Sequence, residues 1–212
     1  MSSRLPSRLL VITDRSATQG RPLRDVVRAA LAGGARLIQL REKNLDGGDL
    51  LALAEALVAD CHDAGAQLLV NDRIDVALAA AAHGVVLPSD SFPTEVARRL
   101  LGPAASIARS THAAAEVERA VREGCDFVLF GPVHATPAKA AFGAPQGIER
   151  LREVSARGIA TFAVGGLTAA NAPAAISAGA YGVAVIREVM SAADPQAAVE
   201  TLLAALGETR VP

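Results

Sequence analysis

The stretch LIQLREK, residues 37–43, decides the fold class, because an apolar run is followed at once by charged residues. Leu37, Ile38 and Leu40 are typical of a buried strand, and Arg41 and Lys43 come directly after it. In a parallel α/β barrel, the residues just beyond the carboxyl ends of the strands build the active site. This stretch therefore predicts a buried parallel strand that ends at a functional site.

The same change from apolar to polar or glycine residues recurs along the chain, in the segments LLVNDR (68–73), IARSTH (107–112), FVLFGP (127–132) and TFAVGG (161–166). The carboxyl ends of parallel barrel strands all lie on one face of the barrel. Charged and glycine residues repeated at those ends therefore gather into one site. This pattern indicates an enzyme.

The order of elements predicts an α/β protein with a single (β/α)8 TIM barrel over residues 1–212. We expect strands near residues 9–13, 36–40, 67–70, 84–87, 106–108, 127–130, 160–164 and 182–185, with helices between them that include 23–32, 49–64, 113–122 and 171–177. A doubly wound open sheet is the alternative. Such a sheet often carries a glycine-rich turn after its first strand, whereas Asp14, Arg15 and Ser16 stand there in this chain.

Composition narrows the possible partners to small molecules. A formal net charge of −1 argues against nucleic-acid binding, which normally needs a basic surface. No run of 18 apolar residues is present to cross a membrane, and the N-terminal residues lead directly into a strand. Cys61 and Cys125 lack metal-ligand spacing and are expected to be reduced thiols, as in a cytoplasmic protein. The apolar face of residues 199–206 suggests a possible homodimer.

Three cationic residues are candidates for binding a diphosphate. Arg41 and Lys43 alternate on one side of the segment after the second strand, and Lys139 lies in a long loop after the sixth. Three cations that converge on the barrel mouth suit a diphosphate better than a single phosphate. The alternative is that each is an ordinary solvated surface side chain.

Glycines after the seventh strand, together with a second, glycine-bearing strand (GAYGVAVI, 179–186), favour a phosphate site. Gly165 and Gly166 follow the strand that ends at Val164, with a helix expected from Thr168, and the last strand ends at Ile186. Loops after barrel strands seven and eight frequently bind phosphate through bare backbone amides. The alternative is that the glycines only permit tight turns.

Oxygen-bearing side chains after strands three and four form a candidate Mg²⁺ site. Asn71 and Asp72 follow the third strand, and Asp90 lies in the loop after the fourth. Mg²⁺ prefers oxygen ligands and keeps several waters. Asn71 and Asp72 are also good capping residues for the helix expected near Ile74, so both roles stay open.

Ser110 and His112 follow the fifth strand, where they are candidates for binding an anion or moving a proton. His112 also precedes a predicted helix, so helix capping is the alternative role for it.

Taken together, the motifs VITDR, IQLREK, VNDRIDVALA, STH, GPVHATPAK, VGGLTAAN and GVAVIREV resemble the family of thiamine phosphate synthase and its sister, the thiazole tautomerase TenI. The resemblance covers nearly the whole chain. It implies a (β/α)8 barrel, dependence on Mg²⁺ and a reaction of two small-molecule substrates. An aminopyrimidine methyl diphosphate would lose pyrophosphate as its methylene carbon joins the ring nitrogen of a thiazole phosphate.

The resemblance also implies roles for single residues. Arg41, Lys43, Ser110 and Lys139 would hold the diphosphate together with Asn71, and Asp72 would bind Mg²⁺. Gln39 would face the pyrimidine. The thiazole phosphate would be held by Thr136, Gly166 and the amides around Val185 and Ile186.

The chain departs from the synthase pattern at Ser91, where the family has a second Mg²⁺-binding aspartate. Asp90 is a candidate to replace it from one residue earlier. A tautomerase of the TenI type, with His112 as acid–base, is one alternative, and a non-catalytic sensor of thiamine intermediates is another. The cationic set with Thr136 and Lys139, for which a tautomerase has little need, favours the synthase.

Overall fold

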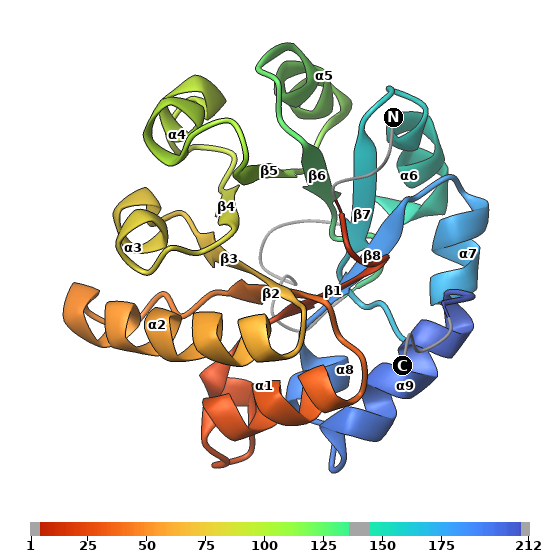
Figure 1. The fold of residues 1–212 in the computed structure, drawn as a ribbon. Helices are drawn as coiled ribbons and strands as arrows, with labels where there is room; N and C mark the ends of the chain where they lie inside the picture. Colours follow the sequence, from red (N-terminus) through yellow and green to blue (C-terminus); the bar gives the residue numbers. More distant parts are fainter. Residues whose placement is uncertain (1–4, 136–144, 209–212) are drawn as a thin grey trace.

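The computed structural model describes residues 5–135 and 145–208, which form a closed barrel of eight parallel strands. Each strand pairs with the next along the chain, and β8 pairs with β1 to close the ring (Figure 1). The strands are β1 (Leu9–Ile12), β2 (Leu37–Leu40), β3 (Gln67–Asn71), β4 (Gly84–Leu87), β5 (Ser106–Thr111), β6 (Phe127–Phe130), β7 (Ala160–Val164) and β8 (Gly182–Val185). The predicted TIM barrel is confirmed, and the open sheet is excluded.

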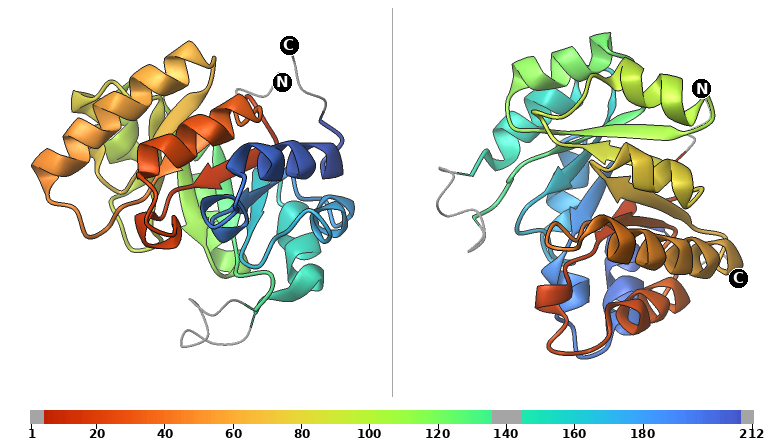
Figure 2. Two further views of the ribbon diagram at one scale, coloured as in Figure 1. Left: turned by 90° about the horizontal axis from the view of Figure 1, so that it is seen from below. Right: turned by 90° about the vertical axis from the view of Figure 1, so that its left-hand side faces the viewer.

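Helices cover the outside of the barrel, as the views in Figure 2 show. They are α1 (Leu23–Ala32), α2 (Gly47–Asp63), α3 (Ile74–Ala79), α4 (Thr94–Leu101), α5 (Ala114–Arg122), α6 (Gly147–Ser155), α7 (Ala172–Ser177), α8 (Arg187–Met190) and α9 (Pro195–Ala205), with a 3-10 turn, η1 (Arg15–Ala17), after β1.

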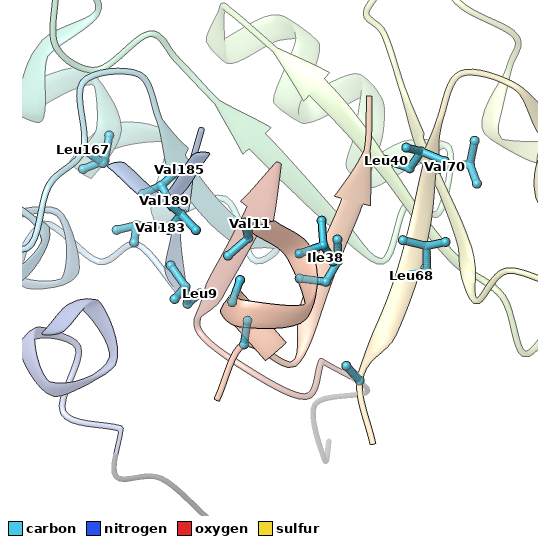
Figure 3. Close-up of a cluster of buried hydrophobic side chains, with 14 of the residues drawn as sticks. Leu9, Val11, Ile38, Leu40, Leu68, Val70, Leu167, Val183, Val185 and Val189 are labelled. Carbon is cyan, nitrogen blue, oxygen red and sulfur yellow. The ribbon is translucent and has the colours of Figure 1, made fainter. Parts of the chain in front are cut away.

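Alternation along each strand divides the core into two layers. One set of side chains, including Leu37, Leu69 and Phe127, fills the barrel interior. The other set faces outward and packs under the helices; Figure 3 shows Val11 and Ile38 in this outer layer. Because successive side chains of a strand point to opposite faces, each strand must be apolar on both. This requirement explains the continuous apolar runs in the sequence.

One predicted helix start is wrong. The helix expected at 171–177 is confirmed as α7, which begins at Ala172, but the start expected at Thr168 is wrong. The side chain of Asn171 accepts a hydrogen bond from the amide of Thr168 at 2.8 Å and donates one to the carbonyl of Gly166 at 2.9 Å. These bonds hold residues 166–171 in a turn, since an asparagine side chain competes with the helix for backbone partners.

The apolar face of α9 is buried within the outer layer of the barrel. Val199, Leu202 and Leu203 are buried, and α9 packs against the end of α1, where a Cβ on Gly33 would lie 2.5 Å from the carbonyl oxygen of Gln196. The face that suggested a homodimer is therefore covered by the chain itself. The homodimer stays a prediction without support from this face.

Neither cysteine is part of a disulfide: Cys61 is a buried free thiol and Cys125 is a half-buried one. Burial raises the pKa of Cys61 to about 12. Within the described residues, no helix has the length and apolar character needed to cross a bilayer.

Candidate active site

Three predicted polar residues share the inward face at the carboxyl ends of their strands. Gln39 follows the inward Leu37 by two residues, Asn71 follows Leu69, and Ser110 follows Ala108. The period of two residues in a strand places all three at the mouth of the barrel, above its apolar interior. The side chains predicted to form one site from β2, β3 and β5 are thus brought to the same opening.

Gln39 and Asn71 are linked directly. The Nε2 of Gln39 donates a hydrogen bond to the Oδ1 of Asn71 at 3.1 Å. Gln39 is only 1% exposed, and its Oε1 has no hydrogen-bond partner among the described residues. A buried acceptor without a partner costs roughly 1–3 kcal/mol. A ligand that donates a hydrogen bond at the mouth would recover that cost.

Arg41 and Lys43 follow β2, and their cationic groups have no ion pair or hydrogen bond within the described residues. Arg41 is partly exposed and Lys43 is exposed. The position of Arg41 is set through its backbone, because its amide donates to the Thr13 hydroxyl at 2.9 Å. As far as residues 5–135 and 145–208 show, these two cations have no protein partner and are available to an anion.

Glu42, between these two cations, organises the loop and was missed in the sequence. Its carboxylate accepts from the Thr13 hydroxyl at 2.7 Å and from the Arg15 amide at 3.1 Å, joining the loop after β1 to that after β2. Burial raises the pKa of the Glu42 carboxyl, and the hydrogen bonds oppose that rise. The only sequence signal for Glu42 was its position: an acidic residue between two cations, Arg41 and Lys43, that were candidates for binding the diphosphate.

Asp72 lies in a strained turn directly after β3. Its φ is +64°, and the amide of Arg73 donates to the carbonyl of Asn71 at 2.7 Å, so Asp72 is the centre of a γ-turn. A non-glycine residue in this region costs on the order of 1–3 kcal/mol and often marks a functional site. The proposed cap role is wrong, since Arg73 is the N-cap of α3 and no side chain caps that helix.

Ser91, rather than Asp90, meets Asp72. The Ser91 hydroxyl donates a short hydrogen bond to the Oδ1 of Asp72, whereas Asp90 is exposed. The described residues contain no group of three or more His, Cys, Asp or Glu side chains that would hold a metal alone. One carboxylate beside amide and hydroxyl oxygens nevertheless fits Mg²⁺, which is usually bound by one or two carboxylates plus substrate phosphates.

A cavity of about 280 Å³ lies beside these groups. Lys43, Asn71 and Asp72 contribute its polar wall, and Leu40 with Leu50 contribute apolar wall. The cavity therefore brings a cation and oxygen donors against the same space.

Ser110 is partly exposed at the mouth, and His112 follows it by two residues. The Nδ1 of His112 lies 2.6 Å from the carbonyl oxygen of Gly131, which only accepts, so Nδ1 carries the proton. The predicted capping role of His112 is wrong: α5 begins after Ala113, and the amide of His112 donates to Glu116 instead. His112 thus ties the loop after β5 to the end of β6.

Gly165 and Gly166 allow the loop after β6 to lie against the end of β7. Both have positive φ, and a Cβ on Gly165 would lie 2.6 Å from the Cβ of Pro132, and one on Gly166 2.7 Å from that of His134. Both glycines are therefore needed for the tight turn after β7, as the alternative interpretation predicted. The amides of Gly166 and Leu167 donate to no described residue, so they remain available to a phosphate.

At the end of β8, Val185 and Ile186 differ in position. The side chain of Val185 lies in the outer apolar layer, as Figure 3 shows. Only the backbone of Val185 can therefore contact a ligand at the barrel mouth. Ile186 is partly buried and precedes α8. Thr136 and Lys139, the remaining predicted site residues, lie outside the described residues.

Comparison with known proteins gives consistent relatives. The chain matches the family model described as "Thiamine monophosphate synthase" over residues 9–189. It is 47% identical over 199 residues to a putative thiamine-phosphate synthase of Geobacter sulfurreducens, covering 93% of each chain. It is 44% identical over 197 residues to a thiamine-phosphate synthase of a Roseiflexus species, covering 92% of this chain and 84% of that one.

A solved structure agrees with these sequence matches. Thiamine phosphate pyrophosphorylase from Pyrococcus furiosus superimposes with a TM-score of 0.85 at 35% identity, covering 94% of this chain and 95% of that one. The fold, the residues gathered at the barrel mouth and these matches agree, and the chain belongs to the thiamine monophosphate synthase family.

Proposed function

We propose that this chain joins an aminopyrimidine methyl diphosphate to a thiazole phosphate and releases pyrophosphate, so that it forms thiamine phosphate. It is a transferase of thiamine biosynthesis, as its family membership shows. The observation that carries the detailed proposal is a cation, Lys43, that lines one cavity with the oxygen donors of Asn71 and Asp72. Arg41 lies two residues before Lys43, and neither cation has a side-chain partner among the described residues.

The proposed diphosphate site lies over β2, β3 and β5. Arg41 and Lys43 would neutralise its oxygens, and the amide of Asn71 and hydroxyl of Ser110 would donate hydrogen bonds to them. As the C–O bond to the methylene carbon breaks, negative charge develops on the departing pyrophosphate. Cations held in place stabilise that charge more in the transition state than in the ground state, which accelerates the step.

Gln39 would position the pyrimidine. Its Oε1 is a buried acceptor without a described partner, while its Nε2 is held by Asn71. An exocyclic amino group on the pyrimidine would donate to this oxygen. The ring nitrogen of the thiazole then forms the C–N bond at the methylene carbon, and no general base is needed because that nitrogen carries a lone pair and no proton.

Mg²⁺ is the proposed cofactor, with Asp72 as its protein ligand, and it would supply positive charge to the pyrophosphate oxygens. The exposed Asp90 is a second candidate ligand. The thiazole phosphate would be bound by Thr136 and by the amides around Gly165, Gly166, Val185 and Ile186, and Lys139 would join the diphosphate site.

The tautomerase alternative has less support. It requires His112 to move a proton, but Nδ1 of His112 is held by the carbonyl of Gly131 as a link between two loops. We expect the His112→Ala variant to keep synthase activity within about tenfold, since one neutral hydrogen bond contributes about 1 kcal/mol. A loss of all synthase activity in folded His112→Ala protein would show that His112 acts in the reaction and does more than link two loops.

The proposed reaction is tested by a product assay. Purified protein is mixed with both substrates and Mg²⁺, and thiamine phosphate is converted to fluorescent thiochrome. We expect turnover that requires both substrates and stops on chelation of the metal. Folded protein that binds thiazole phosphate yet forms no product would refute the synthase.

Asp90→Ala and Asp72→Asn separate the two candidate metal ligands. We expect Asp72→Asn to raise the Mg²⁺ concentration needed for half-maximal activity at least tenfold, and Asp90→Ala to leave it within about twofold. If Asp90→Ala raised the Mg²⁺ requirement and Asp72→Asn did not, Asp90 would be the metal ligand.

We place the protein in the cytoplasm within the same proposal. Its two free cysteines, which are typical of a reducing compartment, support this placement.

A further inference from the structure

One arginine is buried away from the barrel mouth. Arg109 lies in β5, and its side chain is 2% exposed. Ala108 and Ser110 hold the inward positions of this strand, so Arg109 points outward, beneath the helices. Removing a guanidinium from water costs several kcal/mol unless hydrogen bonds and an opposite charge offset the cost. Its partners therefore indicate what role it fills.

Those partners lie almost entirely in one loop. The Nη1 of Arg109 donates to the carbonyls of Pro88 at 3.1 Å and Ser89 at 3.4 Å, and Nη2 donates to the carbonyl of Phe92. Glu123 supplies the opposite charge, with its Oε2 3.4 Å from Nη2. One planar guanidinium thus holds both ends of the segment between β4 and α4.

A second arginine strengthens the same loop. Arg119 of α5 donates to the carbonyl of Ser89 at 2.7 Å. Residues 88–93 belong to no helix or strand, so few of their carbonyls have backbone partners. The two guanidinium groups supply hydrogen-bond donors to the carbonyls of Pro88, Ser89 and Phe92. The shape of this loop is therefore set by side chains of β5 and α5.

The loop reaches the proposed metal ligand. Within it, the amide of Ser91 donates to the carbonyl of Pro88 at 3.2 Å, and the Ser91 hydroxyl donates to Asp72 Oδ1. Asp72 is held from the other side by its γ-turn. Contacts thus run without a break from Arg109 through the loop to the carboxylate of Asp72.

We propose that Arg109 is a positioning residue that fixes the β4–α4 loop so that Ser91 orients the Asp72 carboxylate for the metal. This inference rests on the proposed function, because it takes Asp72 as the Mg²⁺ ligand. Residues that orient a metal ligand typically contribute 10–100-fold to metal affinity. The one sequence signal for such a role is a charged residue, Arg109, within the otherwise uncharged strand segment IARST.

The test measures metal binding rather than turnover. Mn²⁺ and inorganic pyrophosphate serve as probes, and electron paramagnetic resonance gives the Mn²⁺ dissociation constant of the ternary complex. We expect Arg109→Met, which keeps the apolar stem, to raise this constant at least tenfold. Ser91→Ala, at a partly exposed position, should raise it several-fold, and should add nothing in the Arg109→Met background because both act along one path.

Arg98→Met is the matched control. Arg98 also donates to a loop carbonyl, that of Ala105, and pairs with an acidic residue, Asp126, at 2.7 Å, but it holds the loop after α4 instead of the one before it. We expect Arg98→Met to lower thermal stability as Arg109→Met does, while its Mn²⁺ dissociation constant stays within twofold of wild type.

The outcomes distinguish a failure of the metal role of Asp72 from a failure of the positioning role of Arg109. If Asp72→Asn binds Mn²⁺ as wild type does, the metal role of Asp72 is wrong, and this inference fails with it. If Asp72→Asn weakens binding but Arg109→Met behaves like Arg98→Met, only the role of Arg109 is overturned. Should Arg109→Met not fold, Ser91→Ala with unchanged Mn²⁺ affinity overturns the inference in its place.

Discussion

At the residue scale, Arg41 is the clearest case of a side chain positioned for a ligand, because its guanidinium has no partner in the part of the chain that the structure describes. Each charge-assisted hydrogen bond contributes about 1.5–3 kcal/mol, so Arg41→Ala should lower kcat/KM about 10–100-fold. Steady-state kinetics with varied diphosphate substrate measure the change. Arg99→Ala, on the exposed surface of α4, is the control and should have no effect. Equal kinetics for both variants would remove Arg41 from the site.

Glu42 predicts a pH dependence of stability. Burial raises its pKa in the folded state above the usual 4.5, so the folded protein binds this proton more tightly than the unfolded chain does. Below pH 4.5 both states are protonated; as the pH rises through the raised pKa, the free energy of unfolding falls. Glu42→Gln removes this loss.

Chemical denaturation of wild type and Glu42→Gln between pH 4 and 8 tests this. We expect wild type to lose stability relative to the variant as the pH rises. A relative gain with rising pH would mean that the hydrogen bonds to Thr13 and Arg15 outweigh burial, contrary to the direction assigned here.

Single residues also show what the sequence could predict. Gln39, Asn71 and Ser110 follow from strand alternation, because that geometry is local and regular. The contact between Ser91 and Asp72 joins residues 19 positions apart through a non-glycine γ-turn, and neither feature has a local pattern. Glu42 was missed for a related reason: its partner Thr13 follows β1 and lies 29 positions away in the sequence.

At the element scale, the packing of α9 on α1 is tested at Gly33. Its φ is −72°, which any residue adopts, but an added Cβ would lie 2.5 Å from the carbonyl of Gln196 in α9. Gly33→Ala should therefore push the two helices apart and lower the free energy of unfolding by about 1–3 kcal/mol.

Gly48→Ala is the matched control for that variant. Gly48 lies in the first turn of α2, and the nearest atom to an added Cβ is 3.7 Å away. Because alanine is the better helix former, the control should be neutral or more stable by up to about 1 kcal/mol. If Gly33→Ala were as stable as Gly48→Ala, the close approach of α9 to α1 would be refuted.

The elements themselves were largely predictable, and the exceptions have physical causes. Apolar runs marked most strands, because strands buried on both faces are largely apolar. The exception is β5, which carries the buried Arg109 and runs to Thr111, three residues beyond the expected end at Ala108. The helix expected from Thr168 starts four residues later because the side chain of Asn171 takes up the local backbone partners. The helical periodicity of a sequence does not show which side chain will compete with the helix for backbone hydrogen bonds.

At the scale of the whole molecule, Cys61 reports on the closed core. It is fully buried on α2, and its pKa is raised to about 12, so almost no thiolate is present at pH 8. We expect a thiol reagent to label Cys61 only on unfolding, with mass spectrometry identifying the labelled cysteine. Fast labelling of Cys61 in native protein would show that α2 opens without global unfolding.

The barrel brings strand ends that are far apart in the sequence to one opening, and the central claim is that this opening binds the diphosphate and its metal. The most direct measurement is a crystal structure with pyrophosphate and Mn²⁺, whose anomalous scattering locates the metal. We predict pyrophosphate against Arg41, Lys43, Asn71 and Ser110, with Mn²⁺ on Asp72. Pyrophosphate bound elsewhere, or Mn²⁺ on another ligand, would contradict this account.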